Sequence, residues 1–378
     1  MKIAFLSYDF PEYCIRHVNE MADAHEVLLM LPSNVATEHE SMIDTRVRYE
    51  RFFRPRYRQP FRQLATIARI IRTIRKFSPD VIHFQNGHLF FNLFLPLIKR
   101  FPLVITIHDP RQHLGDKESL ITPQWLMDAG FRNADRAIVH GTELVSVVEK
   151  EIGIPKNRLH VIPHIAIGER KMTRVPSDDG QTVLFFGRIW EYKGLDYLIR
   201  AEPAVTARFP GVRFIIGGKG EDFDRYTQLM VHPERFEVHN AWISDEERSR
   251  MFSEASVVVL PYVEASQSGV IPIAYTYGKP VIATNIGGLP EMVEHGRTGL
   301  LVEPRDVDAL ANSIVELLSN AHLRRQLGMA GKAKLDRECS PSVVANQTLE
   351  VYAQAIRDRG HALPDPASTS EQLAKVSS

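Results

Sequence analysis

The fold of this chain is decided by the stretch Ser256-Val-Val-Val-Leu-Pro-Tyr-Val-Glu-Ala-Ser-Gln-Ser-Gly-Val-Ile-Pro-Ile-Ala-Tyr-Thr-Tyr-Gly-Lys-Pro-Val-Ile-Ala-Thr284. Residues 256–260 form an apolar, β-branched run that predicts a strand buried on both faces of a parallel sheet. A helix is expected from Gly269 to Tyr277, because Gly278 and Pro280 supply stop signals. A second strand over 280–284 follows, so the stretch predicts a strand–loop–helix–strand unit.

The polar loop between this strand and helix, 264–268, predicts an anion site. A strand that delivers small residues onto a helix start presents unpaired backbone N–H groups and the positive end of the helix dipole. Ser266, Ser268 and Gly269 are small enough for a phosphate to approach the backbone. An ordinary strand-to-helix turn without a ligand is the alternative, and this loop alone does not choose between the two.

A glycine-rich turn, Asn285-Ile-Gly-Gly-Leu-Pro-Glu291, follows the second strand. Neighbouring loops of this kind predict a crevice, because ligands of open α/β sheets bind outside the carboxyl ends of the strands. The donor half of the retaining glycosyltransferases of family 4 resembles three segments here, Tyr275-Thr-Tyr-Gly-Lys-Pro-Val281, Gly287-Gly-Leu-Pro-Glu291 and Gly296-Arg-Thr-Gly-Leu-Leu-Val302. The resemblance implies the GT-B architecture, an α/β fold of two Rossmann-like domains whose parallel sheets face a central cleft.

Composition sets limits on the class of protein. The 378 residues exceed what one hydrophobic core usually supports, so two domains are expected. A formal net charge of zero argues against a dedicated nucleic-acid binder. Cys14 and Cys339 predict neither a disulfide framework nor a cysteine metal site and favour a reducing cytoplasm. Residues 1–7 are too short for a signal-peptide core, and we expect no transmembrane helix.

The turn-rich segment 166–180 lacks apolar periodicity and predicts a linker between the domains. The resemblance implies an acceptor-binding domain over 1–168 and a nucleotide-sugar donor domain over 169–340. It also implies that a helix over 341–360 crosses back to the first domain. The tail over 361–378 is rich in Pro, Ser and Ala and is expected to be disordered.

The loop Gly187-Arg-Ile-Trp-Glu-Tyr-Lys-Gly194 is similar to the family signature in which an arginine and a lysine hold the donor diphosphate. Arg188 and Lys193 would suit a leaving group that gains negative charge, whereas a basic surface loop is the alternative. A glycine turn after 213–217 fits a nucleotide, while a dinucleotide fingerprint fails because Phe223 replaces its third glycine. The residues expected to bind the donor are Gly187, Arg188, Lys193, Gly217, Gly218, Trp242, Ile243, Glu264, Ser266, Gln267, Ser268, Gly269 and Val270.

A histidine of the first domain is also a candidate. Thr106-Ile-His-Asp109 resembles the point at which the family places a histidine near the transferred sugar, which implies a catalytic role for His108. A structural histidine is the alternative. The resemblance also implies catalytic roles for Glu264, Arg188 and Lys193. Ile273 replaces a second family glutamate, so the nucleotide ribose must be held in another way.

The segment Arg51–Phe77 is strongly basic and contains no acidic residue. Helical spacing over 61–77 predicts a helix whose apolar residues are Phe61, Leu64, Ile67, Ala68, Ile71 and Ile74. One interpretation is a packed helix with a solvated basic face. The other is that Arg51–Lys76 docks on anionic lipid headgroups or receives an anionic acceptor, with Phe52, Phe53 and Tyr57 as interfacial anchors.

The resemblance therefore implies a retaining glycosyltransferase that moves a hexosyl residue from a UDP- or GDP-sugar to a glycan or lipid-linked acceptor hydroxyl. No cofactor is expected, because the nucleotide sugar is a substrate. No metal is expected either, because His83, His88, His108 and His113 lack a familiar ligand spacing. We expect no nucleic-acid partner, and a cytoplasmic protein that associates peripherally with the inner face of the membrane. The alternatives are a non-catalytic sugar-nucleotide-binding protein of the same fold and a nicotinamide dehydrogenase.

Overall fold

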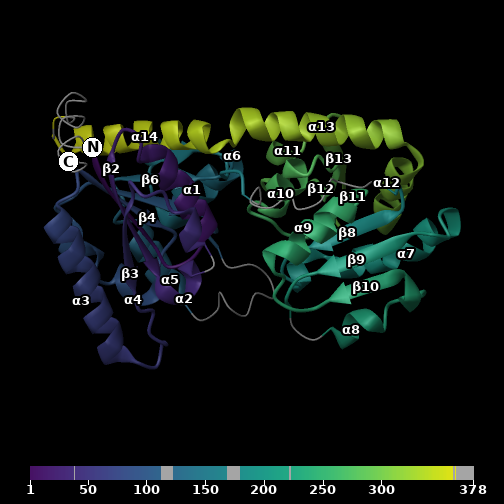
Figure 1. Ribbon diagram of the computed structural model, residues 1–378, viewed down its shortest axis with the longest axis horizontal. Helices are drawn as coiled ribbons and strands as arrows, with labels where there is room; N and C mark the ends of the chain where they lie inside the picture. The colour runs from purple at the N-terminus through teal and green to yellow at the C-terminus, as the bar shows by residue number, and fades with distance from the viewer. Residues whose placement is uncertain (38, 112–121, 168–178, 221–222, 361, 363–378) are drawn as a thin grey trace. The chain divides into compact units, whose positions relative to one another are not determined.

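The computed structural model describes residues 1–37, 39–111, 122–167, 179–220, 223–360 and 362. Contacts between residues divide the chain into two compact units (Figure 1). The first unit holds the described residues up to Ile165 together with those from Ser340 onward, and the second holds those of Ala166–Cys339. The predicted domain boundary at 168 and most of the predicted tail lie outside the described residues.

The first unit is built on a parallel sheet of seven strands in the order β3-β2-β1-β4-β5-β6-β7. Its strands are β1 (Lys2–Ser7), β2 (Glu26–Pro32), β3 (Arg48–Phe52), β4 (Val81–Gln85), β5 (Leu103–Ile107), β6 (Arg136–Val139) and β7 (Leu159–Val161). Strands β4 and β5 are buried along their whole length, which explains their predominantly apolar sequences. Because all the pairs are parallel, the loops that follow the strands share one edge of the sheet.

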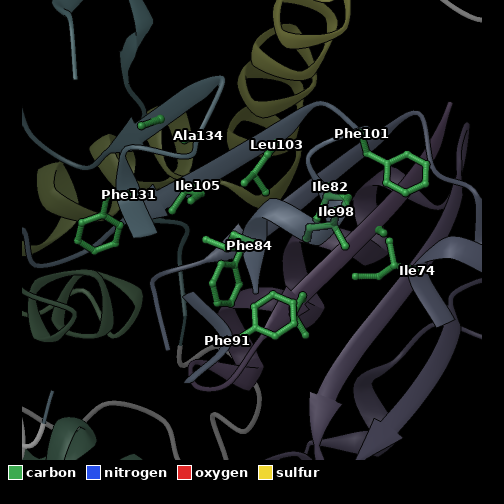
Figure 2. Packing of buried hydrophobic residues seen from close by; sticks show 14 of the residues in the cluster. Ile74, Ile82, Phe84, Phe91, Ile98, Phe101, Leu103, Ile105, Phe131 and Ala134 are labelled. Atoms are coloured by element: carbon green, nitrogen blue, oxygen red, sulfur yellow. The ribbon is translucent and has the colours of Figure 1, made fainter. Parts of the chain in front are cut away.

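Helices cover both faces of this sheet. The helices are α1 (Pro11–Met21), α2 (Ser33–Ala36), α3 (Pro60–Phe77), α4 (Leu89–Asn92), α5 (Gln124–Phe131), α6 (Thr142–Val147) and α14 (Pro341–Asp358). On one face α14 packs against α1 and the central strands, and Tyr352 Oη lies 2.5 Å from His83 Nδ1. Figure 2 shows part of the cluster on the other face, where Ile74 of α3 lies near Ile82 and Ile98.

Helix α3 differs from its predicted packing at its first turns. Phe61 and Leu64 were predicted to belong to the apolar face, but they are 84% and 48% exposed, and Ala68 is exposed as well. Gln63 and Thr66 are buried instead, and their side chains donate to backbone carbonyls of the preceding segment at 2.9 and 3.2 Å. That part of the prediction was wrong, because polar contacts to the backbone set the rotation of the helix start.

The second unit is built on a parallel sheet of six strands in the order β10-β9-β8-β11-β12-β13. Its strands are β8 (Thr182–Phe186), β9 (Arg213–Gly217), β10 (Phe236–His239), β11 (Val257–Leu260), β12 (Val281–Thr284) and β13 (Gly299–Val302). The predicted strands at 256–260 and 280–284 are therefore confirmed as β11 and β12. Both are buried on both faces, as their β-branched sequences predict.

Two hydrophobic clusters flank this second sheet, one centred on α7 and α12 and the other on α9, α10 and α13. The helices are α7 (Leu195–Arg208), α8 (Asp224–Thr227), α9 (Asp245–Glu254), α10 (Val270–Thr276), α11 (Leu289–Met292), α12 (Val307–Ser319) and α13 (Ala321–Glu338). Ser244 and Glu247 form a capping box at the start of α9. None of the described helices is long and apolar enough to cross a membrane.

Candidate functional site

The candidate site of the second unit lies where the order in which strands are added to the sheet changes direction. From β8 the chain adds β9 and β10 on one side and then returns to add β11, β12 and β13 on the other. Ligands of doubly wound sheets bind at such a switch point. The loop after β8 contains Gly187–Gly194 and the loop after β11 contains Pro261–Gly269. Pairing of β8 with β11 makes these two predicted donor segments neighbours.

The two loops touch through their backbones. A Cβ atom on Gly194 would lie 1.9 Å from the carbonyl oxygen of Pro261, and the φ of Gly194 is +66°. The amide of Val263 donates to the carbonyl of Tyr192 at 2.9 Å. Only glycine satisfies both the close approach and the left-handed backbone at position 194. The residue that ends the basic loop is therefore required for the loop to seat on its neighbour.

Two tyrosines hold the basic side chains of this site. Arg188 Nη2 donates to Tyr192 Oη at 3.0 Å. Lys193 Nζ lies 3.7 Å from the centre of the Tyr262 ring and 4.8 Å from that of Tyr192, within the range of cation–π attraction. Burial raises the pKa of Tyr262, so this phenol stays neutral at pH 7 and leaves the positive charge intact. Neither tyrosine was predicted as a site residue, although each lies beside a predicted donor segment.

The loop between β11 and α10 is compact and closed by a second glycine turn. Ser268 is buried, and its Oγ accepts from the amide of Val270 at 3.2 Å and lies 3.2 Å from Tyr262 Oη. A Cβ atom on Gly287 would lie 1.7 Å from the carbonyl oxygen of Ala265. The loop after β12 is thus in contact with the loop after β11. Of the remaining predicted residues on this loop, Ser266 is buried, and Glu264, Gln267 and Gly269 are half-buried.

The other predicted donor residues lie at the ends of β9 and β10. A Cβ atom on Gly218 would lie 1.8 Å from the carbonyl oxygen of Gly187, so the glycine turn Gly217–Gly218 packs directly on the start of the basic loop. Trp242, 77% exposed, and the half-buried Ile243 follow β10, two strands away from β8. Ile273, which replaces the family glutamate, is buried within α10.

His108 lies at the carboxyl end of β5 in the first unit, and it is 2% exposed. The side-chain amide nitrogen of Gln85, at the end of β4, contacts His108 Nε2. Phe10 stacks on the imidazole with ring centres 4.3 Å apart, and Tyr13 meets it edge-on at 5.3 Å. His108 is therefore buried. Its orientation is set by Phe10 after β1, Gln85 at the end of β4 and Tyr13 in the first turn of α1.

His108 belongs to a group of buried histidines, which also contains His17, His83, His140 and His164. The ring of His140 lies 4.7 Å from that of His108 and 5.3 Å from that of His164. Burial lowers the pKa of His17 and His140 to about 3 and that of His164 to about 4, and it holds the pKa of His108 well below its usual value. These imidazoles are therefore neutral at pH 7.

Among the described residues, no three or more His, Cys, Asp or Glu side chains are placed to hold a metal ion. His83 uses both ring nitrogens within the unit, with Tyr352 Oη at 2.5 Å and Thr106 Oγ1 at 2.8 Å. His88 stacks on Tyr8 with ring centres 3.7 Å apart. His113 lies outside the described residues.

Comparisons with known proteins match each of the two units to glycosyltransferases. One family model, Glycosyltransferase Family 4, matches residues 12–165, and another, Glycosyl transferases group 1, matches residues 180–320. The α-D-kanosaminyltransferase of Streptomyces kanamyceticus is 24% identical over 285 residues, which cover 70% of this chain and 74% of the relative. An uncharacterised glycosyltransferase of Methanocaldococcus jannaschii is 29% identical over 185 residues, 48% of this chain and 47% of the relative. The matched region thus spans about half of that second relative.

The structure of HepE from Anabaena in complex with UDP superimposes with a TM-score of 0.70 at 20% identity, covering 94% of this chain and all of that one. This match and the two parallel sheets define the GT-B fold, so the predicted fold class is confirmed. The chain belongs to the glycosyltransferases of family 4. It is accordingly an enzyme of the hexosyltransferase type.

The buried histidines predict a loss of stability in mild acid. Their folded-state pKa values of about 3 to 4 lie below the unfolded value of 6.5, so the unfolded chain binds more protons between these limits. Stability is therefore complete above pH 6.5 and falls as the pH drops towards 4, by about 1.4 kcal/mol per pH unit for each such histidine. Urea unfolding followed by circular dichroism between pH 7 and 5 measures this slope.

The experiment compares His17, a histidine of the cluster, with His322, a control histidine outside it. His17→Gln should reduce the slope by about one proton, because the folded state no longer keeps that imidazole neutral. His322→Gln changes an exposed histidine of α13 and should leave the slope unchanged. A stability that is flat from pH 7 to 5 would contradict the assignment of neutral buried histidines.

Proposed function

We propose that this protein transfers a hexosyl residue from a nucleoside-diphosphate sugar to an acceptor hydroxyl on a glycan or lipid-linked molecule, with retention of anomeric configuration. The observation that carries the proposal is the presence of Arg188 and Lys193 on one loop at the switch point of the second sheet. The HepE structure with UDP makes a UDP-sugar the first donor to test, and a GDP-sugar the second.

The two cations act on the bond that breaks. When the bond between the sugar and the β-phosphate oxygen cleaves, its electron pair passes to that oxygen, where negative charge grows. Preorganised cations stabilise this charge more strongly in the transition state than in the ground state. The contact between Gly194 and Pro261 holds the loop in place before the donor binds. Positioning and electrostatics then account for most of the acceleration, without a covalent nucleophile.

The remaining predicted residues take supporting roles in this proposal. Ser266, Ser268 and Gly269 supply hydroxyl and backbone donors to the nucleotide, and Glu264 contacts the sugar. Because Ile273 cannot bind the ribose, we assign that role to the polar loop 264–268. The proposal includes no cofactor and no metal, since Arg188 and Lys193 supply the positive charge that a metal would otherwise bring.

We also propose that His108 of the first unit serves the transfer step. A neutral imidazole accepts or donates a hydrogen bond without adding charge, and burial favours this state at pH 7. Gln85 and Phe10 hold the ring in one orientation. Such a group is suited to positioning a sugar hydroxyl or a developing charge.

Peripheral membrane binding is the second candidate property. The exposed face of α3 carries Arg69, Arg72, Phe61 and Leu64, and the preceding segment adds Arg58. Exposed aromatic and aliphatic side chains among basic residues are typical of surfaces that rest on anionic lipid headgroups. The corrected rotation of α3 favours this interpretation, because it turns Phe61 and Leu64 towards solvent.

Removal of either cation should reduce turnover more than it weakens donor binding. Loss of one preorganised donor typically costs about 10² to 10³ in rate, and we expect Arg188→Ala and Lys193→Ala to fall in this range. The double variant should lose less than the product of the two, because both groups act on one diphosphate. Initial rates and UDP affinity measured on the same preparations separate the two effects.

Arg200→Ala is the matched control, since Arg200 is an exposed cation of α7 that pairs with Asp196. It should retain activity within about twofold. Rates within about threefold of the unmodified protein for both Arg188→Ala and Lys193→Ala would overturn the donor-site assignment. Tight nucleotide-sugar binding with neither transfer nor donor hydrolysis would favour the non-catalytic alternative. Binding of NAD would favour the dehydrogenase.

His108→Ala should slow transfer by about 10²-fold while the affinity for UDP stays near that of the unmodified protein, because the nucleotide is assigned to the second unit. The control is His140→Gln, which changes a buried histidine of the same cluster, 4.7 Å away. We expect that variant to affect stability more than the rate of transfer. Full activity of His108→Ala, or a large loss of UDP affinity, would place His108 outside the transfer step.

Binding to anionic vesicles should be salt-sensitive and should depend on the basic face. Each basic residue near an anionic surface contributes about 1 kcal/mol, so reversing Arg58, Arg69 and Arg72 to glutamate should abolish co-sedimentation. The control reverses three exposed arginines of the second unit, Arg200, Arg297 and Arg325. Equal co-sedimentation of both triple variants would refute binding through this face.

A further inference from the structure

A polar cavity that the sites above do not use lies in the first unit. It has a volume of about 760 Å³, within the range of about 300 to 1,000 Å³ typical of small-molecule sites. The polar residues that line it include Asn34, Thr37, Arg54, Arg56, Gln59 and Arg62. Because these residues follow β2 and β3 or open α3, the cavity lies at the carboxyl edge of the sheet, the same edge as His108.

The cavity is lined by hydrogen-bond donors. Three arginines face it, and none of its lining residues is an aspartate or a glutamate. Asp9 offsets the charge of Arg54 at 2.8 Å, whereas Arg56 and Arg62 are exposed at the cavity. The side-chain oxygen of Gln59 accepts from the amide of Arg56 at 3.2 Å, which leaves the Gln59 NH₂ group as a donor. Such a lining is suited to an anion with several acceptor oxygens.

One side of the cavity is apolar. Phe53 lines it and is 54% exposed, and Tyr57 and Phe61 on the same segment are 38% and 84% exposed. The volume is much larger than a phosphate ion needs. The ligand that fits this lining therefore joins an anionic group to a larger organic part.

We propose that this cavity binds the phosphate group, single or double, of a phosphorylated acceptor. That the ligand is the acceptor rests on the proposed transferase function, whereas binding of the phosphate does not. Arg54 Nη1 donates to the carbonyl of Tyr8 at 2.9 Å and to Asp9 Oδ1, so the cavity is joined to the loop after β1. The same loop carries Phe10, which stacks on His108. A phosphate beside Arg54 thus lies against the loop that covers the predicted catalytic histidine.

The test measures binding of phosphate probes in a background that removes the proposed donor site. Isothermal titration of the Arg188→Ala/Lys193→Ala protein uses monomeric dihexanoyl phosphatidic acid as a lipid phosphate, and pyrophosphate and glucose 6-phosphate as soluble phosphates. The cavity variant adds Arg56→Ser and Arg62→Ser. The matched control adds Arg297→Ser and Arg325→Ser, which change exposed arginines of the second unit that do not line the cavity.

We expect one probe class to bind at a single site and to lose at least tenfold in affinity in the cavity variant, with less than a twofold change in the control. Tighter binding of the lipid phosphate identifies a lipid-linked acceptor, and tighter binding of the soluble phosphates identifies a soluble one. Arg56→Lys/Arg62→Lys should restore most of the affinity. Absence of binding by every probe, or equal loss in the cavity and control variants, overturns the proposal. Failure of the donor predictions leaves these outcomes unchanged, because the titration measures no turnover.

Discussion

The candidate site of the second unit depends on one backbone contact, the approach of Gly194 to the carbonyl oxygen of Pro261. A Cβ atom at that position would lie 1.9 Å from the oxygen, so any side chain would push the loop after β8 away from the loop after β11. The contact is reinforced by the hydrogen bond from Val263 to Tyr192. It places Lys193 Nζ 3.7 Å from the centre of the Tyr262 ring. Two cations are thereby held at a strand end, and the neutral phenol of Tyr262 does not cancel their charge.

The two units handle charge in opposite ways. The second keeps an exposed guanidinium and a half-buried ammonium at its switch point, where a diphosphate would meet them. The first buries a group of histidines, and the loss of hydration lowers their pKa values until they are neutral at pH 7. Its positive charge lies further along the same sheet edge, on Arg56 and Arg62. If the first unit binds the acceptor, the cavity arginines would bind an anionic group of that molecule, and the neutral histidines would offer uncharged contacts further along the sheet edge.

Helix α3 links the surface of the first unit to its interior. Its middle and last turns place Ile70 and Ile74 in the core, while hydrogen bonds from Gln63 and Thr66 to the preceding backbone set its first turns. This rotation leaves Phe61 exposed next to the arginines. One segment therefore supplies core packing, a candidate membrane face and one wall of the cavity.

The sequence by itself determined the strands, because β-branched runs such as 256–260 favour a doubly buried strand. It also marked two loops whose backbones approach a neighbour closely, because Gly194 and Gly287 leave no room for a Cβ atom. The placement of Phe61 and Leu64 could not be read from spacing alone, since polar side chains at the helix start compete with apolar periodicity for burial. The contact of Lys193 with the Tyr262 ring was also decided only by the tertiary structure. That contact joins residues about 70 positions apart across two paired strands, and only strand order brings such segments together.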